Sequence, residues 1–226
     1  MSRGVTLTRA LESAGFLVLD SRETAAGTEF AVGSAGQTFW DAVTASPEWH
    51  ANPNDPVDAF TRRAIKEALA GYPEAQITFV FDADAPNFVV LWTQTFARIA
   101  QSDLGLMIHP EYGLWMAARA HVVLPRAQEA IVEDDSHKSL INKLQFDPCA
   151  SCRDKPCLSA CPVGAFTAPK TFDFQACADY LLRNPRCFSA GCDARASCPY
   201  GQSWQLPPDQ AHYHQNRFRK ALGSKS

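Results

Sequence analysis

The pattern of apolar and polar residues predicts alternating helices and strands along the first 125 residues. Apolar positions recur at helical spacing in three segments, 7–13, 38–45 and 55–71. Apolar or alternating runs bounded by turn formers predict strands over 16–20, 28–34 and 76–82. Asp55 and Pro56 suit the N-cap and the first position of the third helix, and the polar stretch 46–54 is expected to form a loop.

The rest of this region is more apolar. We expect a buried helix over 87–103 and two strands over 106–125, which surround a Pro-Glu-Tyr-Gly turn. Helices and strands mixed in this order predict an α+β sheet domain over residues 1–125. The acidic stretch 126–147 is expected to be a linker.

Eight cysteines indicate a second, differently built domain, because all of them follow residue 148 and none precedes it. They are Cys149, Cys152, Cys157, Cys161, Cys177, Cys187, Cys192 and Cys198. Two of the cysteines are followed by proline, at Cys161-Pro162 and Cys198-Pro199. We therefore place a cysteine-rich domain at 148–204 and a C-terminal tail at 205–226.

Composition and charge narrow the function classes. No apolar run is long enough for a signal peptide or a membrane span, so we expect a cytoplasmic protein with no membrane partner. A net charge of −3 gives no basic footprint for nucleic acid, and the basic stretch 217–225 is expected to be a solvated terminus. In a reducing cytosol, clustered cysteines favour metal binding over structural disulfides.

The first cysteine run, Cys149-x2-Cys152-x4-Cys157-x3-Cys161-Pro, resembles the run of bacterial ferredoxins, with a longer second gap. In two-cluster ferredoxins the last cysteine of each run binds the other cluster. The resemblance therefore implies two 4Fe-4S clusters with exchanged ligands. One would take Cys149, Cys152, Cys157 and Cys198, and the other Cys161, Cys177, Cys187 and Cys192. A pair of four-cysteine zinc sites and a set of disulfides are the alternatives.

The segment FDFQACADYLLR (172–183), together with both Cys-Pro runs, resembles the iron–sulfur module of epoxyqueuosine reductases and reductive dehalogenases. In those families the module feeds single electrons to a bound cobalamin. The residues inserted in the cysteine gaps depart from both families.

A second resemblance involves DPVDAF (55–60), TQTFARIAQ (93–101) and IHPEYGLWMAARAHVVLP (108–125). These segments are similar to CblC-type cobalamin-processing proteins, which implies a nitroreductase-like fold and a cobalamin whose nucleotide base is detached from cobalt. An axial nitrogen donor stabilises oxidised cobalt, so its removal makes the metal easier to reduce.

This resemblance implies a set of cobalamin-binding residues: Gln94, Thr95, Arg98, Ile108, His109, Pro110, Tyr112, Gly113, Trp115 and Arg119. Six of them have a simpler alternative. His109 fits a hydrogen-bonded turn residue, Trp115 a core aromatic, and Arg119 a buried cation paired with a protein carboxylate. The residues of 94–98 fit a polar helix face.

Together these patterns predict a corrinoid reductase that binds base-off cobalamin, reduces cobalt by one-electron transfer from 4Fe-4S clusters and so removes the upper axial ligand. Cobalt carries the chemistry, so no catalytic residue of the protein is assigned. The expected partners are cobalamin and an electron donor such as a flavoprotein reductase or ferredoxin. The alternatives are a cobalamin chaperone with structural or sensing clusters and a flavin-binding electron carrier that holds FMN.

Overall fold

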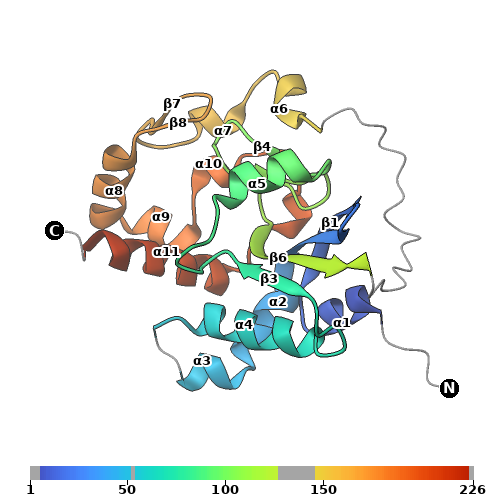
Figure 1. Ribbon diagram of the computed structural model, residues 1–226. Coiled ribbons are helices and arrows are strands. Elements are labelled where there is room, and N and C mark those ends of the chain that lie inside the picture. The colour runs from blue at the N-terminus through green and yellow to red at the C-terminus, as the bar shows by residue number, and fades with distance from the viewer. Residues whose placement is uncertain (1–5, 52–53, 127–145, 224–226) are drawn as a thin grey trace. The chain divides into compact units, whose positions relative to one another are not determined.

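The computed structural model describes residues 6–51, 54–126 and 146–223. The chain forms two compact units, each built from two stretches. We call residues 1–99 with 116–145 the sheet unit, and residues 100–115 with 146–226 the cysteine unit. Their elements are labelled in Figure 1.

The sheet unit contains a four-stranded antiparallel sheet with the strand order β1-β2-β6-β3. Its strands are β1 Leu17–Thr24, β2 Gly27–Ser34, β3 Gln76–Phe79 and β6 Ala117–Pro125. Strand β6 is central, since Ala120 pairs with Val32 on one side and with Phe79 on the other. A strand with two neighbours has little solvent contact, which accounts for the apolar sequence of β6.

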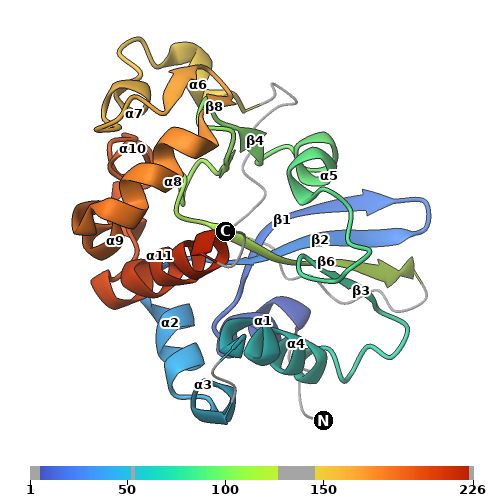
Figure 2. The same ribbon diagram turned by 90° about the vertical axis from the view of Figure 1, so that its left-hand side faces the viewer.

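Five helices cover the sheet: α1 Leu7–Ser13, α2 Gly36–Thr44, α3 Pro47–Ala51, α4 Pro56–Ala68 and α5 Phe88–Thr95. Helices α1 and α4 lie on one side of the sheet and α5 on the other (Figures 1 and 2). Phe16 is in ring contact with Phe39 at 5.6 Å and with Phe60 at 5.8 Å between centroids. The apolar faces of α2 and α4 therefore close one core with the start of β1.

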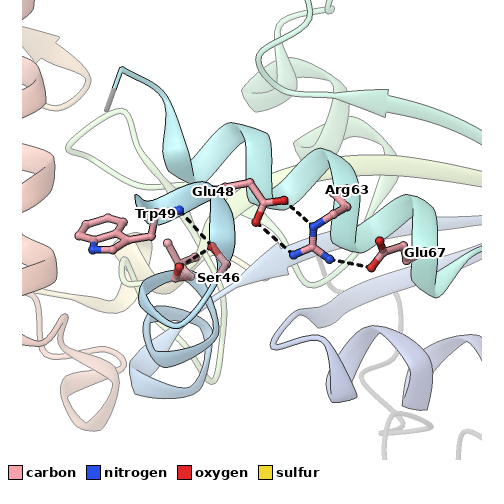
Figure 3. Close-up of polar contacts among 6 residues, drawn as sticks. Ser46, Glu48, Trp49, Arg63 and Glu67 are labelled. Atoms are coloured by element: carbon pink, nitrogen blue, oxygen red, sulfur yellow. Dashed lines mark hydrogen bonds and ion pairs between the residues drawn. The ribbon is translucent and has the colours of Figure 1, made fainter. Parts of the chain in front are cut away.

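The expected loop at 46–54 is wrong in part, because α3 forms inside it. The Ser46 hydroxyl accepts the Trp49 amide at 3.3 Å, and the Glu48 carboxylate binds the Arg63 guanidinium of α4 at 2.5 Å (Figure 3). Arg63 also binds Glu67 at 2.6 Å and holds the pKa of Glu48 below its usual value. The helix depends on a partner 15 residues away, which local sequence does not reveal.

Three other predictions need smaller corrections. Strand β3 ends at Phe79 because the Asp82 carboxylate accepts the Phe79 amide at 3.0 Å and turns the chain. Helix α5 ends at Thr95, short of the expected 103, and the Asp20 carboxylate then binds the Arg98 amide at 2.9 Å. Helix α4 ends at Ala68, and Asp55 is its N-cap residue, but without a hydrogen bond from its side chain to the first turn.

The cysteine unit consists mostly of short elements. Its strands are β4 Ala100–Gln101, β5 Met107–Ile108, β7 Phe166–Ala168 and β8 Thr171–Phe172. Its helices are α6 Pro148–Ser151, α7 Pro156–Ser159, α8 Phe174–Arg183, α9 Pro185–Ala190, α10 Asp193–Ala196, the 3-10 helix η2 Gln202–Trp204 and α11 Pro208–Gly223. Proline begins α6, α7 and α9, where its missing N–H costs nothing.

The two units change the predicted domain boundaries. Residues 100–115 group with the cysteine unit, not with residues 1–99. The strands expected around the Pro-Glu-Tyr-Gly turn do not pair with each other, because β5 pairs with β4 and β6 joins the large sheet. The expected tail at 205–226 contains α11, which packs against α8 and α9 (Figure 2). Of the expected linker, 127–145 lies outside the described residues.

Helices and antiparallel sheets in both units confirm the α+β class. The described helices include none that is long and apolar enough to cross a membrane. The nitroreductase-like fold stays a prediction.

Candidate functional site

Four thiols lie together around α6, α7 and the loop after α10. Burial raises the pKa of Cys157, and the neighbouring thiols of Cys198, Cys149 and Cys152 raise it further. Burial also raises the pKa of Cys198, again with Cys149 and Cys152 as its charged neighbours. We call these four residues the first tetrad.

The other four thiols form a second tetrad, Cys161, Cys177, Cys187 and Cys192. Burial raises the pKa of Cys177 to about 11, with contributions from Cys192, Cys161 and Cys187. All four line one cavity of about 220 Å³ in the cysteine unit. The two tetrads are the two ligand sets that the ferredoxin-like exchange of cysteines implies. That they bind clusters stays a prediction.

Backbone amides point at several of these sulfurs. The Asp103 amide lies 3.4 Å from Cys149 Sγ, and the Ala165 amide lies 3.4 Å from Cys161 Sγ. Backbone N–H groups of Arg195 and Ala194 bond to Cys192 and lower the pKa of its thiol, although burial raises it more. Donors of this kind stabilise a thiolate and tune the potential of a bound cluster.

The donor set fits iron–sulfur clusters. Buried thiols with raised pKa values resist ionisation, and a bound metal reverses this because its positive charge stabilises thiolates. Each tetrad supplies the four cysteines that one 4Fe-4S cluster needs. Within the described residues, no three His, Cys, Asp or Glu side chains form a group that could hold a single metal ion.

Residues 100–115 support the first tetrad. The Asp103 side chain, which is 11% exposed, binds the Lys155 ammonium, and Lys155 Nζ also donates to the Cys149 carbonyl at 3.3 Å. Ile108 and Leu114 share a buried apolar cluster with Cys157. Sequence reasoning missed Asp103, because it stands at the end of an expected apolar helix and carries no motif.

Arg195 is a second residue that the sequence did not indicate. Its Nε and Nη2 donate to the Leu114 carbonyl at 3.0 and 2.6 Å, and its guanidinium lies 4.7 Å from the centre of the Trp115 ring. Burial lowers the pKa of Arg195 to about 10, so it keeps its charge at neutral pH. Its position between Cys192 and Cys198 in the sequence could have indicated that Arg195 lies near the thiols.

The structure distributes the expected cobalamin residues over both units. Six lie in the cysteine unit: Ile108, His109, Pro110, Tyr112, Gly113 and Trp115. His109 is fully buried, and its Nδ1 accepts the amides of Glu111 at 3.2 Å and Tyr112 at 3.4 Å. The Tyr112 ring stacks on His109 at 4.7 Å. These contacts favour the alternative in which His109 is a hydrogen-bonded turn residue.

The other four lie in the sheet unit. Gln94 is exposed on α5, whereas Thr95 and Arg98 are half-buried. Arg119 is buried on β6, donates to Ser34 Oγ at 2.9 Å and lies 4.5 Å from the centre of the Phe39 ring. A cobalamin pocket built from these ten residues stays a prediction.

Comparisons with known proteins give a weak similarity to one kind of solved structure. No protein-family model matches the chain, and no curated protein matches it. A crystal structure of epoxyqueuosine reductase with an epoxyqueuosine-modified tRNA-Tyr stem loop is 14% identical, with a TM-score of 0.47. That match covers 91% of this chain and 69% of the reductase.

Two further epoxyqueuosine reductases are each 16% identical. One is selenomethionine-labelled, with a TM-score of 0.43 and 87% of this chain covered. The other comes from Bacillus subtilis, with a TM-score of 0.42 and 85% covered. This chain spans 50% of the length of each.

Proposed function

We propose that this chain is an iron–sulfur reductase that holds two 4Fe-4S clusters and reduces a corrinoid. The observation that carries the proposal is the grouping of the eight cysteines into two tetrads. Each tetrad takes one ligand from beyond its own sequence run, Cys198 for the first and Cys161 for the second. When bound, 4Fe-4S clusters supply transfer of single electrons.

The surroundings of the tetrads suit that role. Amides of Asp103 and Ala165 donate toward ligand sulfurs, which favours the thiolate form that metal binding requires. Lys155, which pairs with Asp103 and donates to the Cys149 carbonyl, ties helix α6 to residues 100–115. Arg195 brings a buried positive charge near Cys192, and positive charge near a cluster favours its reduced state.

Three observations support a corrinoid as the electron acceptor: the two family resemblances and the position of segment 108–115 in the cysteine unit. The segment 108–115, which resembles CblC-type proteins, lies in the same unit as the cysteines. Two of its residues, Ile108 and Leu114, pack in the apolar cluster that contains Cys157 and Cys198. A corrinoid held by this segment would lie beside the first tetrad. Detachment of its axial base would make cobalt easier to reduce.

Anaerobic spectroscopy tests the proposal. Protein reduced with dithionite and freed of excess reductant is mixed with cyanocobalamin, and the absorbance spectrum is followed. We expect binding and conversion to the cobalt(II) spectrum. Cys177→Ser and Cys198→Ser should lose most of the conversion. Bound cyanocobalamin that keeps its spectrum in the presence of reduced protein would refute the corrinoid assignment.

A further inference from the structure

Exposed apolar side chains gather around the second tetrad. Of the eight large hydrophobic residues recorded as exposed in the described chain, five lie in the segments that follow Cys161 or in α8 and α11. They are Val163, Phe172, Phe174, Leu182 and Phe218, between 36% and 47% exposed. We call these five residues the aromatic face. Four of them are joined by ring contacts or by the cavity that they line, and Leu182 lies on α8 with Phe174. Exposed apolar groups that gather in this way mark an interaction surface.

The aromatic rings of this face are continuous. The centroid of the Phe174 ring lies 6.5 Å from that of Phe172 and 6.0 Å from that of Phe218. Val163, Phe172 and Phe218 also line the cavity that the four thiols of the second tetrad line. The face therefore reaches from the protein surface to the walls of this metal site.

The segments that carry the face have a net positive charge, whereas the whole chain has a net charge of −3. Segments 163–183 and 208–223 carry five Lys and Arg against three Asp, whereas the chain has 24 acidic and 21 basic residues. Lys170, Arg183, Arg219 and Lys220 are exposed. Asp173 accepts the Ala176 amide at 2.9 Å, and Asp179 accepts the Gln175 side-chain amide at 3.0 Å.

We propose that the aromatic face is the docking surface for an acidic one-electron carrier protein. The inference rests on the proposed function and names its electron donor. The basic residues would steer an acidic partner, and the apolar centre would exclude water where the two redox groups approach each other. In the transfer one electron leaves the reduced carrier and reduces this protein by one equivalent. No bond is made or broken.

Stopped-flow reduction by carriers of two kinds, an acidic 2Fe-2S ferredoxin and a flavodoxin, tests the surface. The charge variant combines Lys170→Glu with Lys220→Glu, and the apolar variant combines Phe174→Ser with Leu182→Ser, residues that do not line the cavity. Matched controls are Lys66→Glu and Val90→Ser, exposed positions of the sheet unit. Dithionite is the carrier-independent reductant for every variant.

We expect the charge variant to lower the second-order rate constant by about tenfold at low salt and to flatten its salt dependence. The apolar variant should react more slowly at every salt concentration, while both controls behave as wild type. Dithionite should reduce all variants alike, with unchanged cluster spectra.

The outcomes separate the two proposals. If dithionite reduces no cluster in the wild type, the proposed function fails. If dithionite reduces the clusters but the variants keep wild-type rates with both carriers, only the docking surface fails. A charge variant that loses binding of a tRNA stem loop and keeps its carrier rates would assign the face to nucleic acid and overturn the proposal.

Discussion

The sheet unit and the cysteine unit are stabilised in different ways. The sheet unit has a 13-residue helix, a 9-residue central strand and a core of large apolar side chains such as Phe16 and Phe60. In the cysteine unit α11 has 16 residues, but α6, α7 and α10, which lie beside the cysteines, have four residues each. Cys157 and Cys198 belong to the apolar cluster itself. One-turn helices are unstable alone. The comparison predicts that apolar burial holds the sheet unit, whereas the cysteine unit depends on the clusters that we propose it binds.

The largest expected effect comes from removal of the metal. Oxidation and chelation under mild conditions should unfold the cysteine unit, because its short elements lose their common ligand, and should leave the sheet unit folded. Hydrogen exchange followed by mass spectrometry measures both units in one sample. We expect amides of α8 and α11 to lose protection and amides of β2 and β6 to keep it. An equal loss of protection in both units would contradict the claim that only the cysteine unit depends on metal.

If the ligands are exchanged between the clusters, substitutions of two nearby cysteines should affect different clusters. Cys157 and Cys161 are four residues apart, yet they belong to different tetrads. Cys157→Ser and Cys161→Ser should each lose about half of the iron, but from different clusters, so their electron-paramagnetic-resonance spectra should differ. Cys198→Ser should match Cys157→Ser. Identical spectra for Cys157→Ser and Cys161→Ser would rule out the exchange.

A glycine pair tests how tightly the 100–115 segment is packed in the cysteine unit. Gly113 has a φ of +55°, and a Cβ there would meet the Tyr200 carbonyl oxygen at 2.1 Å. Gly105 also has a positive φ, +79°, but has open space around it. We expect Gly105→Ala to cost about 1 kcal/mol of unfolding free energy through φ alone. Gly113→Ala should cost about 2 kcal/mol more, because backbone atoms must move.

Thermal or denaturant unfolding of the cluster-loaded protein provides the measurement for both variants. Equal costs would show that residues 112–113 and 200–201 are not in close contact.

The smallest expected effect is a pH dependence in the sheet unit. Burial lowers the pKa of His121; Glu29 opposes this shift and Arg22 adds to it. In the unfolded chain this histidine has a pKa of about 6.5 and binds a proton below that pH, whereas in the folded protein it stays neutral to lower pH. Stability therefore falls as the pH drops through about 6.5. Protection factors of the β6 amides, measured by hydrogen exchange, should decrease less between pH 7 and pH 5 in His121→Phe than in wild type. A larger decrease in protection in the variant would contradict the expected contribution of His121.

Local patterns were sufficient to predict several elements. Helix α1 and strands β1 and β2 follow from apolar spacing. The two ligand sets that the cysteine order implies stay a prediction. The sequence did not reveal features that depend on distant partners. Helix α3 needs Arg63, α5 ends where Asp20 binds the chain, and the role of Asp103 depends on Lys155, which is 52 residues away. Period and propensity carry no information about such contacts.

The most direct test of the central claim is an anomalous-scattering map of anaerobically grown crystals, recorded across the iron and zinc absorption edges. Two 4Fe-4S clusters should appear, one bound by Cys149, Cys152, Cys157 and Cys198 and the other by Cys161, Cys177, Cys187 and Cys192. Zinc at either position, or Cys198 and Cys161 bound to the opposite clusters, would contradict it.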